Sequence, residues 1–233
     1  KSSPFGVVSS FLIGISHSAV FSLIAVYATS MNFSILEVSI VTFLFAISGA
    51  ISQWPIGKLS DVLDRRIVII YTTFGAALFC FLAIISSGQM YMPAGLATSK
   101  IFFYICIMCF SFCSLPMFAL IFAHTNDFIP KEKFVAAGAG LQFVFGLGAI
   151  CGPFMCSLFM EFLGENGFFI FLIIFHSFIG LFGIYRMQIR ESGDNPDSQF
   201  APMPQTITPA GIELNPSTEP IDEPNNLNEF KKI

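Results

Sequence analysis

Acidic and basic side chains with the spacing for short-range ion pairs gather in one ten-residue run, residues 57–66. Asp61 lies four positions before Arg65, and Arg66 follows directly. A carboxylate and a guanidinium form charge-assisted hydrogen bonds, which partial burial strengthens. Because such contacts form and break as units, this run is a candidate for holding one conformational state of the protein. Gly57, at its start, permits close backbone approach.

Two uncharged polar side chains stand deep inside apolar segments, where a polar group is costly and is a functional candidate by default. His17 can hydrogen-bond a solute or carry a proton, and Gln142 offers an amide. For each a structural alternative stays open: His17 bonded to a serine hydroxyl or a backbone carbonyl, and Gln142 bonded to a neighbouring helix. No Asp or Glu lies in the middle of an apolar segment, so proton coupling would need His17 or a carboxylate outside this chain.

A further polar group closes the apolar segment that ends at residue 124. We expect His124 and Asp127 at the same membrane level as Arg65 and Arg66. One interpretation is that Asp127 or His124 engages the arginine pair and stabilises one state. The alternative is a capped, solvated helix end.

These residues must be positioned by helices that lie in lipid. The 233 residues are 55% hydrophobic and only 11% charged, whereas soluble domains carry about 25% charged residues. Six segments approach or exceed the roughly 20 apolar residues that a helix needs to cross a bilayer. We therefore predict an all-α membrane protein with one unit over residues 1–186. The predicted spans are residues 5–29, 38–57, 67–86, 101–124, 135–158 and 167–186.

The segment 187–233 differs from the spans in composition. It has eight acidic residues against Arg190, Lys231 and Lys232, and it is rich in Pro, Asn and Ser. Such a composition predicts a disordered acidic tail. The formal net charge of −4 therefore leaves the membrane unit near +1, and nothing indicates nucleic-acid binding.

Orientation follows from the lysines and arginines near the ends of the spans, which favour the cytoplasmic side. They fall almost entirely on the face that the two termini share, so both termini are expected in the cytoplasm. On that face lie Lys1, Lys58, Arg65, Arg66, Lys131, Lys133, Arg186 and Arg190, and on the other Lys100.

The run at 57–66 resembles the G-x-L-x-D-x-x-x-R-R cytoplasmic gate loop of the major facilitator superfamily, which recurs in weaker form between helices 8 and 9. The matching positions are Gly57, Leu59, Asp61, Arg65 and Arg66. Val62 and Asp64 replace the usual basic residue and glycine, as is common in the second copy. A second motif, Gly148-x-x-x-Gly152-Pro153, is similar to the superfamily pattern of helix 5 and of its equivalent, helix 11. Its glycines open a groove for another helix.

The resemblance implies the C-terminal six-helix half of a secondary active transporter, which moves small solutes by alternating access without a cofactor or metal. The groove at Gly148 and Gly152 is then expected to find its main partner in a missing N-terminal half. A homodimer is the arrangement expected if the chain is complete. The first, second, fourth and fifth spans would surround the solute cavity, which leaves His176, in the sixth, a structural role. Pro116 is expected to bend the fourth span.

Residues 53–61 and 123–127 are also similar to the bacterial YcaD-like branch, which implies the bacterial inner membrane. The alternative function is a membrane sensor or assembly factor that moves nothing. An intramembrane enzyme is disfavoured because the histidines lack the H-E-x-x-H spacing and paired carboxylates, and no Gly-rich phosphate loop is present.

Overall fold

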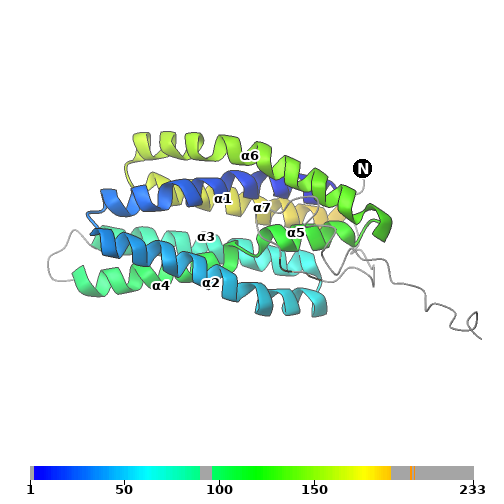
Figure 1. The fold of residues 1–233 in the computed structure, drawn as a ribbon, viewed down its shortest axis with the longest axis horizontal. Coiled ribbons are helices and arrows are strands. Elements are labelled where there is room, and N and C mark those ends of the chain that lie inside the picture. Colours follow the sequence, from blue (N-terminus) through cyan, green and yellow to red (C-terminus); the bar gives the residue numbers. More distant parts are fainter. Residues whose placement is uncertain (1–2, 90–95, 190–199, 201, 203–233) are drawn as a thin grey trace, which may run out of the picture.

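The computed structural model describes residues 3–89, 96–189, Phe200 and Pro202. Within these residues the chain is a helical bundle without strands (Figure 1), which confirms the predicted all-α class. Among the described residues, six helical spans are long and apolar enough to cross a membrane. Of the predicted tail, residues 190–199, 201 and 203–233 lie outside the described residues. The helices are α1 (Pro4–Ser30), α2 (Ile35–Val62), α3 (Arg65–Gln89), α4 (Leu96–Ser114), α5 (Met117–Asn126), the 3₁₀ helix η1 (Lys131–Lys133), α6 (Phe134–Leu163) and α7 (Gly167–Ile189).

Several helices are longer than the predicted spans, and this corrects one local prediction. We expected residues 57–66 to form a turn, but α2 continues to Val62 and only Leu63 and Asp64 separate it from α3. Hydropathy marks the part of a helix that lies in lipid, whereas the hydrogen-bonded backbone continues into the polar region. Most of the gate loop is therefore the last turn of α2.

The fourth span is interrupted at Leu115 and Pro116, which separate α4 from α5. Proline has no backbone N–H and cannot continue the helical ladder from the preceding turn. The Leu115 N–H still donates to the Ser111 carbonyl at 3.0 Å, and the helical pattern resumes where Leu120 donates to the Pro116 carbonyl at 3.0 Å. The expected bend at Pro116 is thus present, as a break between two helices.

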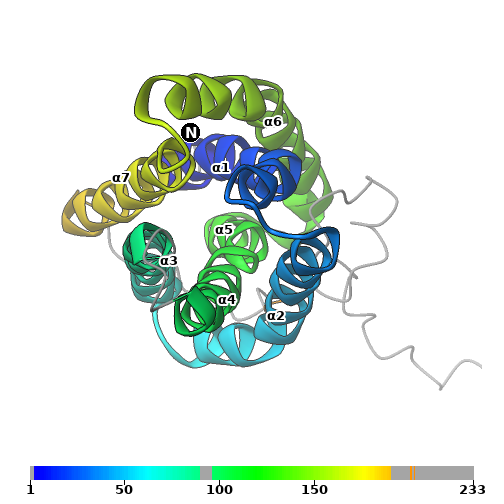
Figure 2. The same cartoon turned by 90° about the vertical axis from the view of Figure 1, so that its left-hand side faces the viewer.

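Helix α6 lies along α1, and this is the most extensive contact in the bundle (Figure 2). Glycines on both helices allow it: a Cβ on Gly14 would collide with the Phe145 carbonyl, and one on Gly148 with the Phe11 carbonyl. We expected the groove at Gly148 and Gly152 to have its main partner in a missing half. Instead α1 of the same chain fills it, because the backbones approach too closely for any side chain.

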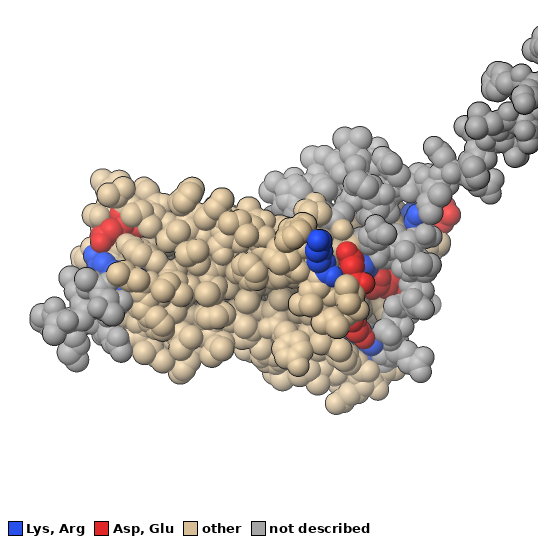
Figure 3. All heavy atoms as spheres, turned by 90° about the horizontal axis from the view of Figure 1, so that it is seen from below, with Lys and Arg blue, Asp and Glu red and all other residues tan. Residues whose placement is uncertain are grey.

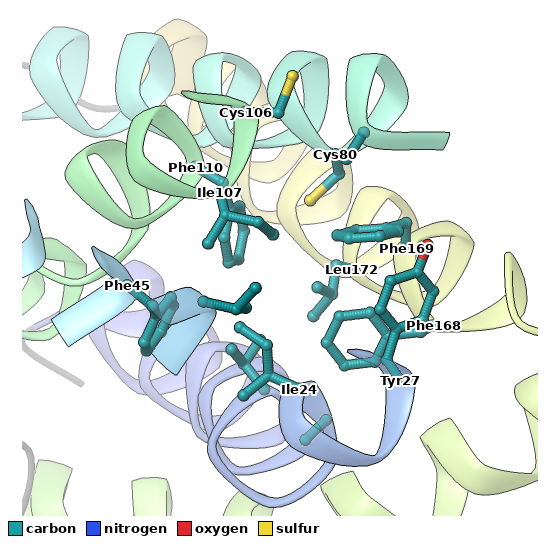
Figure 4. Packing of buried hydrophobic residues seen from close by; sticks show 14 of the residues in the cluster. Ile24, Tyr27, Phe45, Cys80, Cys106, Ile107, Phe110, Phe168, Phe169 and Leu172 are labelled. Carbon is teal, nitrogen blue, oxygen red and sulfur yellow. The ribbon is translucent and has the colours of Figure 1, made fainter. Parts of the chain in front are cut away.

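Aromatic and aliphatic side chains fill the bundle at the end away from the N-terminus (Figure 4). Tyr27 of α1 packs against Phe103, Phe168 and Phe169, with ring centroids 5.9, 5.3 and 4.9 Å away. On the face shown in Figure 3, the charged side chains of the described residues gather at the two ends and leave an uncharged region between them. This division is what a bilayer requires, because burying a charge in hydrocarbon is costly.

Candidate functional site

Arg65 stands at the start of α3 and joins three helix ends. Its Nη1 donates to Asp127 Oδ1 at 2.5 Å and to the Ala123 carbonyl at 3.0 Å. Its Nη2 donates to Asp61 Oδ1 at 3.1 Å. Only 7% of Arg65 is exposed, so water competes weakly for these bonds. We refer to Asp61, Arg65 and Asp127 as the Arg65 cluster; it connects the last turn of α2 and the end of α5 through the first residue of α3.

The second arginine of the motif has a different partner. Arg66 Nη2 lies 2.6 Å from Asp64 Oδ2, and the Arg66 backbone N–H donates to Asp64 Oδ1 at 2.9 Å. Partial burial opposes ionisation of Asp64, but these hydrogen bonds outweigh it and hold the pKa of the carboxyl below its usual range. Asp64 replaces the glycine usual at this position, and it binds the adjacent arginine within the same turn.

The remaining motif residues lie around the same helix end. Leu59 is half-exposed, and its carbonyl accepts from the Leu63 N–H at 2.9 Å. Gly57 is buried beneath the ring of Phe200, where a Cβ would collide with that ring. The Phe200 N–H donates to Asp61 Oδ1 at 2.9 Å. A residue from the far C-terminal segment therefore contacts the gate loop, a contact that the sequence did not indicate.

His124 lies close to the Arg65 cluster but packs against rings. It forms edge contacts with Phe5 and Phe128, each with centroids 5.1 Å apart. It also lines a small cavity together with Arg66 and Arg186. Of the two residues expected near the arginine pair, Asp127 forms an ion pair with Arg65, whereas His124 contributes mainly an aromatic contact.

His17 is 1% exposed in the middle of α1. Its Nε2 lies 3.1 Å from both the carbonyl oxygen and the hydroxyl of Ser114, the last residue of α4. These are the bonds that the structural alternative describes, and a role in transport stays a prediction. Gln142, on α6, is half-buried, and neither candidate lines the cavity between α1, α5 and α6 that is described next.

A cavity of about 680 Å³ opens between the start of α1, the end of α5 and the start of α6. Its walls are mostly aliphatic, with Ser3, Thr125 and Lys133 as polar members. Apart from Lys133, which was counted for membrane orientation, these residues were not predicted from the sequence. The only signal for the cavity was the small-residue character of the facing helix surfaces. The lining comprises Ser3, Pro4, Val7, Val8, Thr125, Ile129, Lys133, Ala136, Ala137, Gly140, Leu141 and Val144.

Buried serines that the sequence analysis passed over connect α2 to α4. The Ser48 hydroxyl donates to the Met108 carbonyl at 2.6 Å, and the Ser111 hydroxyl donates to the Phe45 carbonyl. In lipid such interhelical bonds contribute about 0.6–2 kcal/mol each. The sequence around a serine in an apolar segment does not indicate which group the hydroxyl will bond to. The partners of these serines are therefore identified only by the three-dimensional arrangement.

Comparison with known families agrees with this arrangement, since the sequence profile of the Major Facilitator Superfamily matches residues 6–221. The chain belongs to the Major Facilitator Superfamily. It is a multi-pass integral membrane protein of a family of membrane transporters, and members of this family are generally not enzymes. The resemblance to the YcaD-like branch stays a prediction.

Curated relatives of this superfamily member are bacterial proteins described as uncharacterized MFS-type transporters. One from Yersinia enterocolitica is 23% identical over 201 residues, which cover 86% of this chain and 47% of the relative. YfkF of Bacillus subtilis is 27% identical over 154 residues, 64% of this chain and 35% of the relative. The chain thus spans about half the length of the relatives it matches, or less. No solved structure matches it.

Proposed function

We propose that this chain is the C-terminal half of a secondary active transporter that moves a small solute by alternating access. Both termini face the cytoplasm of a bacterial cell, and the membrane is the inner membrane. The Arg65 cluster is the observation that carries the proposal. It holds the cytoplasmic ends of α2, α3 and α5 together through one buried guanidinium.

Alternating access requires the cytoplasmic ends of helices to separate in one state and meet in the other. Asp61 and Asp127 lie on different helices and both bind Arg65, so separating α2 from α5 breaks at least one of these bonds. The cluster therefore favours the state in which these ends meet. Asp127 is the stronger partner, since its side chain is 12% exposed against 38% for Asp61.

Two observations support the proposal that this chain is one half of a transporter: the part of its relatives that it matches, and the apolar side chains that its helices expose. The relative from Yersinia enterocolitica extends over about twice the matched length. Helices α2 and α6 leave large apolar side chains exposed, including Trp54 and Phe154, which fits contact with lipid or with a second six-helix half. The coding sequence upstream of Lys1 should encode six more spans and a stronger G-x-L-x-D-R-x-G-R-R loop. A stop codon directly upstream would exclude this arrangement and leave the homodimer.

Transport is tested on the full-length protein reconstituted in liposomes and screened against small solutes under an imposed ion gradient. Flux that needs no ATP and disappears when the gradient collapses is the expected result. A folded protein that moves no solute in the screen would favour the alternative, a non-transporting sensor or assembly factor. His17→Ala is expected to lower flux without lowering folded yield, and Gln142→Ala tests the second candidate for solute contact in the same way.

A further inference from the structure

A continuous chain of buried hydrogen-bonding groups crosses the middle of the bundle, and the gate loop takes no part in it. It contains Ser16 and His17 of α1, Ser114 of α4 and His176 of α7, each 0–1% exposed. His17 Nε2 lies 3.1 Å from Ser114 Oγ, and that hydroxyl lies 2.9 Å from His176 Nε2. His176 Nδ1 lies 3.3 Å from Ser16 Oγ. The two histidines are thus joined through one serine.

Backbone carbonyls determine which nitrogens carry hydrogen. His17 Nε2 is 3.1 Å from the Ser114 carbonyl, and His176 Nδ1 is 2.9 Å from the Leu172 carbonyl. A carbonyl only accepts, so both nitrogens must donate. In the neutral ring the other nitrogen accepts, which makes His176 Nε2 an acceptor. The Ser114 hydroxyl therefore accepts from His17 and donates to His176, and every bond in the chain has a defined direction.

Within the part of the chain that the structure describes, no fixed charge stands beside these hydrogen-bonded groups. The described Asp, Glu, Lys and Arg side chains lie at the helix ends, as Figure 3 shows for one face. Away from the charged helix ends, the ionisable groups on the helices packed around it are thiols, among them Cys113 on α4, Cys80 on α3 and Cys156 on α6, and tyrosines, among them Tyr27 on α1 and Tyr104 on α4. The ring of Phe145 on α6 contacts that of His17, with centroids 6.3 Å apart, and the ring of Phe110 on α4 contacts that of His176, with centroids 5.6 Å apart. A protonated, positively charged histidine at this site has no compensating charge while the helices are packed around it. It becomes favourable only in a state in which water reaches the ring.

We propose that His17, Ser114 and His176 form a proton-binding site in which the Ser114 hydroxyl passes a proton between the two imidazoles. A proton binds the acceptor nitrogen of His17, Nδ1. The proton on Nε2 then moves to Ser114 Oγ while the original hydroxyl proton moves to His176 Nε2. His17 is left neutral with hydrogen on Nδ1, and His176 becomes the imidazolium. No other reactant is needed.

The transfer also changes a contact at the helix break. Once Nε2 of His17 has given up its hydrogen, it can no longer donate to the Ser114 carbonyl, which lies directly before Leu115 and Pro116. One bond between α1 and the break is lost. Proton binding and movement at Pro116 are therefore linked, and by reciprocity a state with the break opened binds the proton more tightly. This deepens the proposed function by naming the proton as coupling ion.

The test uses side-chain ¹⁵N NMR of the full-length protein labelled on histidine. Three histidines lie in this chain; His17→Gln, His124→Gln and His176→Gln variants identify the three signals. At pH 8 we expect hydrogen on Nε2 of His17 and on Nδ1 of His176. On acidification from pH 8, both signals should change together in one shared transition.

Two variants of α4 distinguish a relay from general loosening. Ser114→Ala should abolish the shared transition, whereas Ser114→Thr, which keeps the hydroxyl, should retain it. Ser111→Ala removes a buried serine one turn away that bonds to Phe45, and it should leave the transition unchanged. Histidines 17 and 176 that change in two separate transitions, that stay neutral until the protein unfolds in acid, or that titrate alike in Ser114→Ala would overturn the inference. Proton binding without solute flux would instead contradict the transport proposal alone.

Discussion

Asp127 is the residue whose replacement most directly tests the Arg65 cluster. Asp127→Asn removes the negative charge that lies 2.5 Å from a buried guanidinium while keeping the side-chain size. The Asn oxygen can still accept from Arg65 but no longer compensates its charge, so part of the about 1.5–3 kcal/mol of a hydrogen bond to a charged group is lost, and we expect a lower midpoint of thermal unfolding in detergent. We also expect a cysteine introduced into the cavity between α1, α5 and α6 to become more accessible to thiol reagents.

Two matched variants accompany Asp127→Asn. Asp61→Asn removes the more exposed partner of Arg65 and should cost less, under about 1 kcal/mol. Glu132→Gln changes an exposed carboxylate on η1 and should have no effect. If Asp127→Asn leaves both cavity accessibility and transport unchanged, the cluster does not stabilise a state of the transport cycle.

The lowered pKa of Asp64 predicts that the folded protein loses stability as the pH falls into the acid range. Its pKa is lowered in the folded protein because the bonds from Arg66 outweigh the effect of partial burial. The unfolded chain therefore takes up the proton first. The stabilisation is complete above the ordinary carboxyl pKa of about 3.9 and is lost as the pH falls through the lower folded value.

Unfolding midpoints of the wild type and Asp64→Asn between pH 6 and pH 3 measure this contribution. The wild type should be the more stable protein at pH 6, and the difference should shrink below pH 4. A difference that is constant over the whole range would show that Asp64 does not act through its charge.

At the scale of the helix, the contact of α1 with α6 depends on glycines that have no room for a side chain. Gly148→Ala places a methyl group against the Phe11 carbonyl, and only separation of the two helices relieves the overlap. Overpacking of this kind costs about 1–3 kcal/mol, so we expect a lower unfolding midpoint and a lower yield of monodisperse protein.

The same helix supplies the control for Gly148→Ala. Gly146 has open space around its would-be Cβ. Gly146→Ala should be neutral or stabilise the helix by up to about 1 kcal/mol. Equal behaviour of the two variants would mean that close packing on α1 is not what Gly148 provides.

Helix positions were largely predictable because each span must satisfy its own backbone in lipid and present an apolar surface. The partners of these helices were less predictable. The glycines at 148 and 152 indicate that some helix approaches closely, but the identity of that helix depends on the complementary profile of α1. Likewise the spacing of Asp61, Arg65 and Asp127 indicated ion pairing, whereas Ser114 looks like any other polar residue until the break at Pro116 places it between two histidines.

At the scale of the whole molecule, topology is decided by the charges at the two ends of the bundle. Lys58, Arg65, Arg66, Lys131 and Lys133 lie at one end, and Lys100, paired with Glu37 at 2.6 Å, lies at the other. Lysines and arginines are retained on the cytoplasmic side during insertion. The end that carries the Arg65 cluster should therefore face the cytoplasm.

Single cysteines on η1, just before α6, and in the last turn of α6 test this orientation. Glu132→Cys and Glu161→Cys both place a thiol at an exposed position, one at the end of the Arg65 cluster and one at the opposite end. In intact cells, a membrane-impermeant maleimide should label position 161 and leave position 132 unlabelled, and lysis should expose position 132. Labelling of the unsubstituted protein is measured in parallel and subtracted, because the chain has cysteines of its own. If position 132 is labelled in intact cells, the topology is the reverse of the one proposed. The Arg65 cluster would then lie outside, where it could not close a cytoplasmic opening.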